Sequence, residues 1–383
     1  MPARAAVRER LVRADDLNTA PPWLTSNAVD GLGGRRPGAV AALASGRTAR
    51  RGRVQRGYQA EPGLAMKIVY IAGVGRSGST LLERMLGAVP GSVNAGELNA
   101  VFSRVAAQDQ RCGCGEPFSA CPFWAKVGDH AFGGWSEVAP RMAHLQPRVV
   151  RQRHVGRMAT GLAAAEYRRE LDEYLDVYHR LYRSVAEVSG AEVVVDASKS
   201  AAQLFALRRI AGLDLRIVNL VRDSRGVASS WTKTGVLKPQ SQTGDTMGTY
   251  RPQRLAVLWA ALQLECSYLG AAAPYATRVR YEDLVARPRP TLEKALRDLD
   301  LSTGTAGLAH VGDRSVLLGA SHGVAGSRSR FVTGRIDLEL DDAWRTTLPA
   351  SARRVVTAVT LPQLIGYGYV GHRSRTPAPG GAR

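Results

Sequence analysis

Lysine is scarce in this chain: only six of its 52 basic residues are lysines, so 46 are arginines. Acidic residues are also few, and the 33 Asp and Glu leave a formal net charge of +19. Such an excess favours anionic partners, although a compositional bias towards arginine explains it equally well. Aromatic residues make up 6% of the sequence. No basic segment is interleaved with aromatic residues in the way that binding of single-stranded nucleic acid requires.

Long hydrophobic runs are missing too. No apolar stretch approaches the roughly 20 residues that a membrane-spanning helix needs. The N-terminal sequence MPARAAVRERLVRADD has no apolar core of the signal-peptide type. We therefore expect a soluble, cytoplasmic protein. A chain of 383 residues, 45% of them hydrophobic, is long enough to bury a sizeable core.

Residues 1–65 differ in composition from the rest. They contain eleven Arg against five acidic residues, with many Gly, Pro and Ala and little periodicity. This composition predicts a disordered basic arm. Alternatively, translation starts at Met66, directly before the first predicted strand. We expect one folded domain over residues 66–372 and a disordered tail over residues 373–383.

Short β-branched runs alternate with amphipathic segments across this domain. The pattern predicts strands at 67–72, 192–196, 215–221 and 277–281, and helices at 79–88, 97–107, 168–188, 200–211, 251–272 and from 224 onwards. Such alternation is typical of parallel strands with helices on both faces. We therefore predict an α/β fold with three layers, α/β/α, around a central parallel sheet.

The sequence IVYIAGVGRSGSTLL at 68–82 combines a buried strand, a glycine-rich turn and the start of a helix. In this arrangement backbone N–H groups and the helix dipole bind an anionic phosphate. Gly73, Gly78 and Thr80 fit the nucleotide-triphosphatase pattern G-x-x-x-x-G-K-[ST], but Ser79 stands where that pattern has lysine. We expect the loop to bind a phosphate-like group without the ammonium that contacts the β- and γ-phosphates. A purely structural strand–helix turn is the alternative.

Two further polar segments follow predicted strands, where ligands bind in open α/β sheets. The segment Asp196-Ala-Ser-Lys199 ends one strand, and Arg222 ends the next, with Ser230 about two helical turns later. An Arg and a Ser so placed can contact one dianion from two sides, and the guanidinium of Arg76 can contact two oxygens of another. Together they predict a ligand with two separated anionic groups.

The segments GRSGSTLL, Gly96-Glu97 and VRDSRGVASSW (221–231) resemble the sulfotransferase family, whose members use 3′-phosphoadenosine 5′-phosphosulfate (PAPS) and have a P-loop-like core. The resemblance runs from about Lys67 to Tyr369, and the Arg-Ser-Gly loop is closer to the carbohydrate and tyrosylprotein sulfotransferases. It implies that Arg222 and Ser230 bind the 3′-phosphate. The loop residues that would bind the 5′-phosphosulfate are Arg76, Ser77, Gly78, Ser79 and Thr80.

The same resemblance assigns further roles. Glu97 would be the general base, and Lys199 with Arg76 would stabilise the charge that develops during transfer. Asp196 would orient Lys199 or cap the next helix. His322 and Arg330 would cover the nucleotide in a segment similar to the family's H-x-x-x-G-N-P-x-R loop, although Ser327-Arg328 replace its Asn-Pro.

The resemblance therefore implies sulfuryl transfer from PAPS to an acceptor hydroxyl, or as second choice an amine, with no metal required because a sulfuryl group carries less charge than a phosphoryl group. The acceptor would be a small molecule, carbohydrate or natural product, held by residues 112–168 and those after Trp231. The alternatives are a nucleoside or small-molecule kinase on the same core and a non-catalytic nucleic-acid-binding protein.

Three of the four cysteines, Cys112, Cys114 and Cys121, are close together in the sequence. A zinc site needs four ligands, so Cys266 or His130 would have to supply the fourth. The C-x-C-x₆-C spacing misses the usual C-x₂₋₄-C pairs. A disulfide or a structural thiol cluster is the interpretation that this spacing favours.

Overall fold

The computed structural model describes residues 66–160, 163–233, 248–301 and 305–371, and the predicted arm (1–65) and tail (373–383) lie outside these ranges. A five-stranded sheet with the order β2-β3-β1-β4-β5 runs through the centre, and all its pairings are parallel. Its strands are β1 (Met66–Gly73), β2 (Ser92–Gly96), β3 (Val193–Lys199), β4 (Leu213–Val221) and β5 (Ala276–Arg280). The predicted α/β fold with a central parallel sheet is confirmed.

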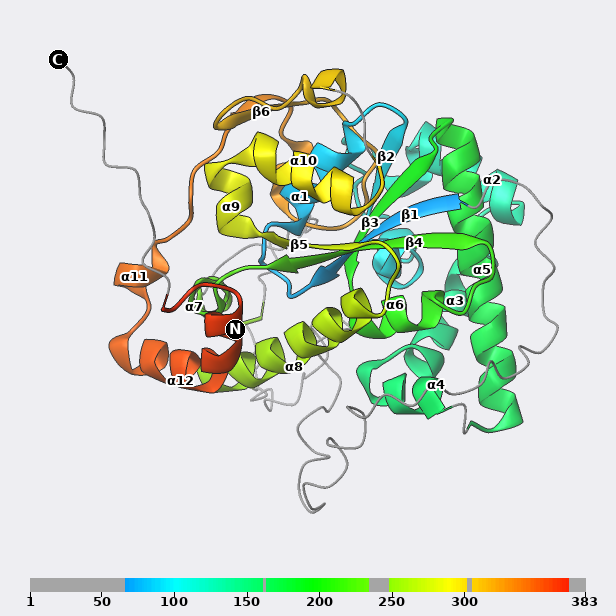
Figure 1. Ribbon diagram of the computed structural model, residues 1–383. Coiled ribbons are helices and arrows are strands. Elements are labelled where there is room, and N and C mark those ends of the chain that lie inside the picture. Colours follow the sequence, from blue (N-terminus) through cyan, green and yellow to red (C-terminus); the bar gives the residue numbers. More distant parts are fainter. Residues whose placement is uncertain (1–65, 161–162, 234–247, 302–304, 372–383) are drawn as a thin grey trace, which may run out of the picture.

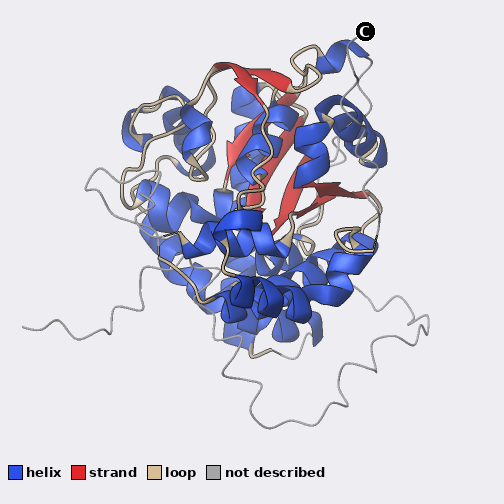
Figure 2. Cartoon of the chain, turned by 90° about the vertical axis from the view of Figure 1, so that its left-hand side faces the viewer, coloured by secondary structure: helices blue, strands red, loops and turns tan. Residues whose placement is uncertain are grey.

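The sheet is buried on both faces, as the apolar composition of its strands requires. In β1, Ile68 and Tyr70 belong to one hydrophobic core, whereas Val69 and Ile71 belong to a second core on the opposite face. Successive side chains of a strand point to opposite faces, so this one strand contributes to both cores. Figure 2 shows the strands enclosed between layers of helices.

Helices from distant parts of the chain cover the two faces. In Figure 1, α1, α9 and α10 lie above the sheet and α6 and α8 lie below it, which agrees with the two cores. The longer helices are α1 (Ser79–Gly87), α2 (Pro122–Phe132), α3 (Val138–Val149), α5 (Ala165–Ser189), α6 (Ala201–Leu207), α7 (Ser224–Thr232), α8 (Pro252–Ala271), α10 (Pro288–Asp298) and α12 (Ala350–Gly366).

Shorter elements connect this framework. A two-stranded antiparallel sheet pairs β6 with β7. The remaining elements are η2 (Leu98–Ala100), η3 (Val101–Ala106), η4 (Phe118–Ala120), η5 (Gln152–His154), α4 (Val155–Thr160), α9 (Tyr281–Ala286), η6 (Thr305–Leu308), β6 (Ser315–Leu318), η7 (Arg328–Phe331), β7 (Gly334–Asp337) and α11 (Trp344–Thr347). Among the described residues, no helix combines the length and the apolar composition needed to cross a membrane.

Two details differ from the predictions. The strand β2 was not predicted, because its sequence SVNAG is short and only half apolar. The helix expected at 97–107 is instead a 3₁₀ turn, η2, followed by a π-helical segment, η3. Segments of π-helix are uncommon and occur often at functional sites, and this one follows directly after Glu97.

The carboxyl ends of four neighbouring strands meet at one side of the sheet. Gly73 ends β1, Gly96 ends β2, Lys199 ends β3, and Arg222 follows β4. Because β2 and β3 lie on one side of β1 and β4 and β5 on the other, the strand order reverses at β1, and ligands bind at such a switch point in open α/β sheets. The polar residues predicted from the sequence therefore converge on one region.

Candidate active site

The loop between β1 and α1 depends on its glycines. Gly73 has a φ of +149°, and a Cβ there would lie 2.4 Å from the backbone oxygen of Leu220. Gly78 caps α1 with a φ of +87°, and its Cβ would lie 2.6 Å from Cδ2 of Tyr281. Ser77 is 0% exposed, and its Oγ has no hydrogen-bond partner in the part of the chain that the structure describes. Such a buried hydroxyl is available to a ligand.

Two arginines lie at this loop, Arg76 within it and Arg222 beside it. Arg76 has a φ of +71°, in the left-handed region, and its Cζ lies 5.3 Å from the ring centroid of Trp231. Arg222 donates a 2.9 Å hydrogen bond from Nη1 to the backbone oxygen of Arg76. Burial, and then the charge of Arg222, lower the pKa of Arg76. Two neighbouring cations in a partly buried site favour an anionic ligand.

Asp341 neutralises Arg222 in this structure. Nη2 of Arg222 lies 2.9 Å from both the backbone oxygen and Oδ2 of Asp341, and its Cζ lies 4.5 Å from the centroid of the Tyr281 ring. Burial alone would raise the pKa of Asp341, but the hydrogen bond and charge of Arg222 hold it below its ordinary value. Ser230, the predicted partner of Arg222, lies half-buried in the last turn of α7.

Glu97 and Lys199 form the central ion pair of the site. Lys199 Nζ lies 2.6 Å from Glu97 Oε1, and the residues are 6% and 9% exposed. Lys199 has a φ of +63° and donates a second hydrogen bond, 2.9 Å long, to the backbone oxygen of Ala197. Nη2 of Arg104, in η3, lies 3.8 Å from the other carboxylate oxygen of Glu97. The carboxylate thus faces two cations.

Asp196 joins the segments that carry this ion pair. Its Oδ1 accepts hydrogen bonds from the backbone N–H of Leu98, at 3.4 Å, and of Ser198, at 2.8 Å. Its Oδ2 accepts one from the Tyr182 hydroxyl at 2.5 Å. Ser200, rather than Asp196, caps α6. Burial raises the pKa of Asp196 to about 6, although its hydrogen bonds act in the opposite direction. Asp196 therefore positions the residues next to Glu97 and Lys199.

The segment at 321–330 lies against the other side of Glu97. The backbone of Val324 bonds to that of Glu97 at 2.8 Å and of Ala95 at 3.1 Å. Ser327 N donates to Thr80 Oγ1 at 3.1 Å. Arg330 is 2% exposed and donates to the backbone oxygens of Arg111 and Gly326. Thus, Thr80, Glu97 and Arg330 are brought together.

Glu83 was not predicted to belong to the site. It lies in α1 and is fully buried, and its Oε1 accepts hydrogen bonds from Gly96 N at 2.7 Å and from Asn94 Nδ2 at 3.0 Å. Burial raises its pKa to about 7 despite these bonds. The only signal in the sequence is that Glu83 lies among the apolar residues Leu82, Met85 and Leu86 of α1, which are buried with it.

His322 lies among the cysteines. Its Nδ1 is 3.3 Å from Cys121 Sγ and 3.7 Å from Cys112 Sγ, and Cys114 Sγ is 3.7 Å from Cys121 Sγ. All three cysteines are free thiols. Neither of the two residues considered as a fourth ligand belongs to this group: His130 pairs with Glu187, and Cys266 is buried in the core. The role of His322 in covering a nucleotide stays a prediction.

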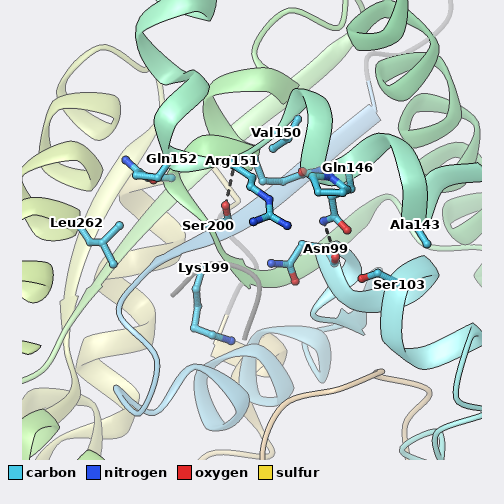
Figure 3. Close-up of a pocket in the computed structure, with 13 residues that line it drawn as sticks. Asn99, Ser103, Ala143, Gln146, Val150, Arg151, Gln152, Lys199, Ser200 and Leu262 are labelled. Atoms are coloured by element: carbon cyan, nitrogen blue, oxygen red, sulfur yellow. Dashed lines mark hydrogen bonds between the residues drawn. The ribbon is translucent and has the colours of Figure 1, made fainter. Parts of the chain in front are cut away.

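A cavity of about 120 Å³ lies beside Lys199 (Figure 3). Gln146 donates a 2.7 Å hydrogen bond to the backbone oxygen of Asn99 at its wall. Six of the lining residues come from the region 112–168, which was predicted to hold the acceptor. The acceptor was also expected to contact residues after Trp231, and of these, residues 234–247 lie outside the described part of the chain. The lining residues are Asn99, Ser103, Ala143, Gln146, Pro147, Val150, Arg151, Gln152, Lys199, Ser200, Ala201, Gln203 and Leu262.

The fold and this site define an α/β enzyme whose strand–loop–helix unit lies beside two arginines. The profile of the "Sulfotransferase family" matches residues 69–304, more than half of the chain. The chain therefore belongs to the sulfotransferase family, and the resemblance drawn from its motifs is confirmed at that level.

Solved structures of sulfotransferases are similar to this chain. The sulfotransferase domain from the Synechococcus PCC 7002 olefin synthase is 19% identical, with a TM-score of 0.41, over 80% of this chain and 98% of that chain. The sulfotransferase domain from the curacin biosynthetic pathway is 18% identical, with a TM-score of 0.41, over 77% and 97%. Sulfotransferase STF1 from Mycobacterium tuberculosis H37Rv is 18% identical, with a TM-score of 0.33, over 64% and 70%. No curated protein matches the chain.

Proposed function

We propose that this protein transfers a sulfuryl group from PAPS to an acceptor hydroxyl, or as second choice an amine, within a unit formed by residues 66–372. The observation that carries the proposal is that Arg222 contacts the backbone of Arg76 in the glycine loop, at the same edge of the sheet as the buried pair of Glu97 and Lys199. PAPS has anionic groups at its 5′ and 3′ ends, and two separate cations suit such a ligand.

The residues of the loop suit the 5′-phosphosulfate of PAPS. Ser77 offers a buried hydroxyl without a partner among the described residues. Gly78 has no Cβ, so the loop can turn into α1 without a clash with Tyr281. Arg76 supplies a planar guanidinium, and the N-terminus of α1, with Ser79 and Thr80, supplies backbone N–H groups. The sequence Arg76-Ser77-Gly78 also supports a relationship to the carbohydrate and tyrosylprotein branch. Arg222 and Ser230 would bind the 3′-phosphate.

The chemical step needs one base and several cations. An oxygen of the acceptor attacks the sulfur, the bond from sulfur to the 5′-phosphate oxygen breaks, and 3′,5′-adenosine bisphosphate leaves. Glu97 accepts the acceptor's proton. Lys199 and Arg76 stabilise the negative charge that develops on the bridging oxygen and the leaving phosphate. Asp196 keeps the backbones next to Glu97 and Lys199 in place. No step in this mechanism uses a metal.

The cavity beside Lys199 is our candidate for the acceptor site. Its polar lining includes Asn99, Ser103, Gln146 and Gln203, which offer both hydrogen-bond donors and acceptors. Such side chains suit a hydroxylated acceptor more than a purely apolar one. The π-helical η3 carries Ser103 into the lining and Arg104 towards Glu97, so one segment would contact both the acceptor and the base.

Calorimetric titration with 3′,5′-adenosine bisphosphate tests the donor. We expect binding without magnesium, and ATP to bind at least 10-fold more weakly because it lacks a 3′-phosphate for Arg222. In Arg222→Ala the affinity should fall by about 10- to 100-fold, since a hydrogen bond to a charged group contributes about 1.5–3 kcal/mol. Arg345→Ala, an exposed arginine that pairs with Asp342, is the matched control. Binding of Mg·ATP alone would reject the proposal in favour of a kinase.

A further inference from the structure

We propose that Cys112, Cys114, Cys121 and His322 bind one structural Zn²⁺ ion. The three thiol sulfurs and the imidazole nitrogen all lie within 4.8 Å of one another. Three Cys and one His form a common ligand set of structural zinc sites. The proposal revises the sequence-based expectation of no metal ligand, and it is independent of the proposed reaction.

Three of the separations between these atoms are close to those of a tetrahedral zinc site. Zn–S bonds of about 2.3 Å and Zn–N bonds of about 2.0–2.1 Å require about 3.8 Å between two sulfurs and about 3.5 Å between a sulfur and a nitrogen. Cys114 Sγ and Cys121 Sγ are 3.7 Å apart. His322 Nδ1 lies 3.3 Å from Cys121 Sγ and 3.7 Å from Cys112 Sγ. These distances leave room for an ion at the centre without a change of fold.

The backbone around the thiols is a tight, hydrogen-bonded turn. Cys112 N donates to Glu116 O at 2.8 Å, and Gly115 N donates to Cys112 O at 2.9 Å. Gly115 has a φ of +98°, which permits this turn. Cys121 then precedes the first residue of α2, so that helix fixes its position. Cys112 and Cys121 are buried and Cys114 is half-buried.

The ring of His322 is oriented by aromatic neighbours. It stacks on Phe123, with the ring centroids 4.8 Å apart and an angle of 13° between the planes. The backbone oxygen of His322 accepts a 2.8 Å hydrogen bond from Trp124 Nε1. Both residues belong to α2, which begins next to Cys121. The packing therefore holds Nδ1 towards the thiols, as a zinc ligand requires.

The surroundings also suit the charge of the complex. Three thiolates and one Zn²⁺ ion carry a net charge of −1. Arg330 is buried, donates to the backbone oxygen of Arg111 next to Cys112, and has an Nε without a partner among the described residues. A buried guanidinium at this place would offset the negative charge. Thiolate ligands select zinc over harder cations such as Mg²⁺, and four protein ligands leave no open position for a substrate.

The ion would connect the turn at 111–121 with the segment at 321–330. Two residues after His322, the backbone of Val324 bonds to Ala95 and Glu97. Gly113 N also donates to Gly323 O at 3.1 Å. Because the segment is attached on both sides, release of the ion would loosen the support of Glu97 without removing any residue that contacts the substrate.

Metal analysis of the full-length protein tests the inference. The protein is expressed with zinc in the medium and purified under reducing conditions without chelators. We expect about one zinc per chain, and X-ray absorption of the wild-type protein should show three sulfurs at about 2.3 Å and one nitrogen at about 2.0–2.1 Å. A content below about 0.2 zinc per chain, or a zinc ion coordinated by oxygen and nitrogen only, overturns the proposal.

Variants assign the ligands. Cys114→Ser and His322→Ala should each weaken zinc binding by at least about 10-fold in a chelator competition. Even the loss of a residue that only hydrogen-bonds to a metal ligand weakens metal binding by that much. Cys266→Ser, which changes a buried cysteine outside the cluster, should keep the wild-type affinity. Loss of zinc in Cys266→Ser alone, or a disulfide among the three clustered cysteines in the purified protein, contradicts the proposal. Since none of these measurements uses turnover, they separate this inference from the proposed reaction.

Discussion

Lys199 Nζ lies 2.6 Å from Glu97 Oε1, although Lys199 ends β3 and Glu97 follows β2. The contact depends on the pairing of β2 with β3, in which Gly96 lies opposite Asp196. Each partner therefore limits the side-chain conformations of the other. In the proposed mechanism the base reaches the site already oriented, with a cation beside it, which favours proton transfer at a defined atom.

The base is tested by Glu97→Gln. We expect turnover to fall by about 10²- to 10⁴-fold, the usual contribution of a general base. Affinity for 3′,5′-adenosine bisphosphate should stay within a few-fold of the wild-type value, because Glu97 does not contact the proposed phosphate sites. Release of this product from PAPS, measured over a panel of hydroxylated acceptors, gives the turnover. Glu173→Gln is the matched control, since Glu173 pairs with Arg141 on the exposed surface. Full activity of Glu97→Gln would remove Glu97 from its role.

Asp341 is predicted to compete with the nucleotide for Arg222. In Asp341→Asn the side chain loses its charge, so the affinity for 3′,5′-adenosine bisphosphate should rise by about 2- to 5-fold, in the range of a partly exposed ion pair. Asp342→Asn is the control, because the neighbouring carboxylate pairs with Arg345 instead. Calorimetric titration of the three proteins measures the difference. An unchanged affinity in both variants would show that Asp341 does not compete.

The buried carboxyl of Asp196 should make stability depend on pH. Its pKa is raised from 3.8 to about 6, so the folded protein binds more protons than the unfolded chain between these values. The free energy of unfolding therefore falls as the pH rises through this window, by at most about 3 kcal/mol. Asp196→Asn cannot titrate. We expect the wild-type protein to lose stability relative to this variant between pH 4 and pH 7.

Equilibrium unfolding in urea at several pH values measures this difference. Glu83 and Glu265 have pKa values raised to about 7, chiefly by burial, and contribute a slope of the same sign to both proteins. The comparison with Asp196→Asn cancels their contribution. Asp172→Asn, on the exposed side of α5, should keep the wild-type pH dependence. A parallel pH dependence of the wild type and Asp196→Asn would contradict the prediction.

Gly78→Ala should destabilise the protein more than Gly190→Ala. Both glycines have positive φ values, +87° and +67°, so both substitutions carry the strain of that conformation, roughly 1 kcal/mol. Only at Gly78 would the new Cβ also meet the Tyr281 ring, whereas nothing lies within 4 Å at Gly190. For Gly78→Ala we therefore expect the free energy of unfolding, measured in urea, to fall by about a further 1–3 kcal/mol. Nucleotide binding should also weaken. Equal losses in the two variants would show that the ring moves away freely.

The sequence predicted those parts of the site that local patterns specify. The β1 strand, the glycine turn and α1 follow one another within a short segment, and Arg222 ends an apolar run, so strand ends could be located without a structure. The strand β2 was not predicted because its sequence SVNAG has few β-branched residues. Its position is fixed by pairing with β3, which no short window of sequence reveals.

Contacts between distant segments could not be predicted. His322 reaches Cys112 and Cys121 because Val324 pairs with the backbone beside Glu97, and this pairing has no local signature. The partner of Arg222 could not be predicted either, because Asp341 belongs to a segment far along the chain and has an ordinary sequence context. Local composition specifies which groups are available, whereas the fold decides which of them meet.

The pairing of Val324 has a consequence for the solution behaviour of the protein. The strand β2 is the outermost strand of the sheet on its side, and such a strand exposes backbone groups that can pair with another chain. Gly96 forms a parallel bridge with Val324, so these groups are covered at the end of β2 that leads into Glu97. The segment at 321–330 thereby protects the sheet from edge-to-edge aggregation at the point where the active site begins.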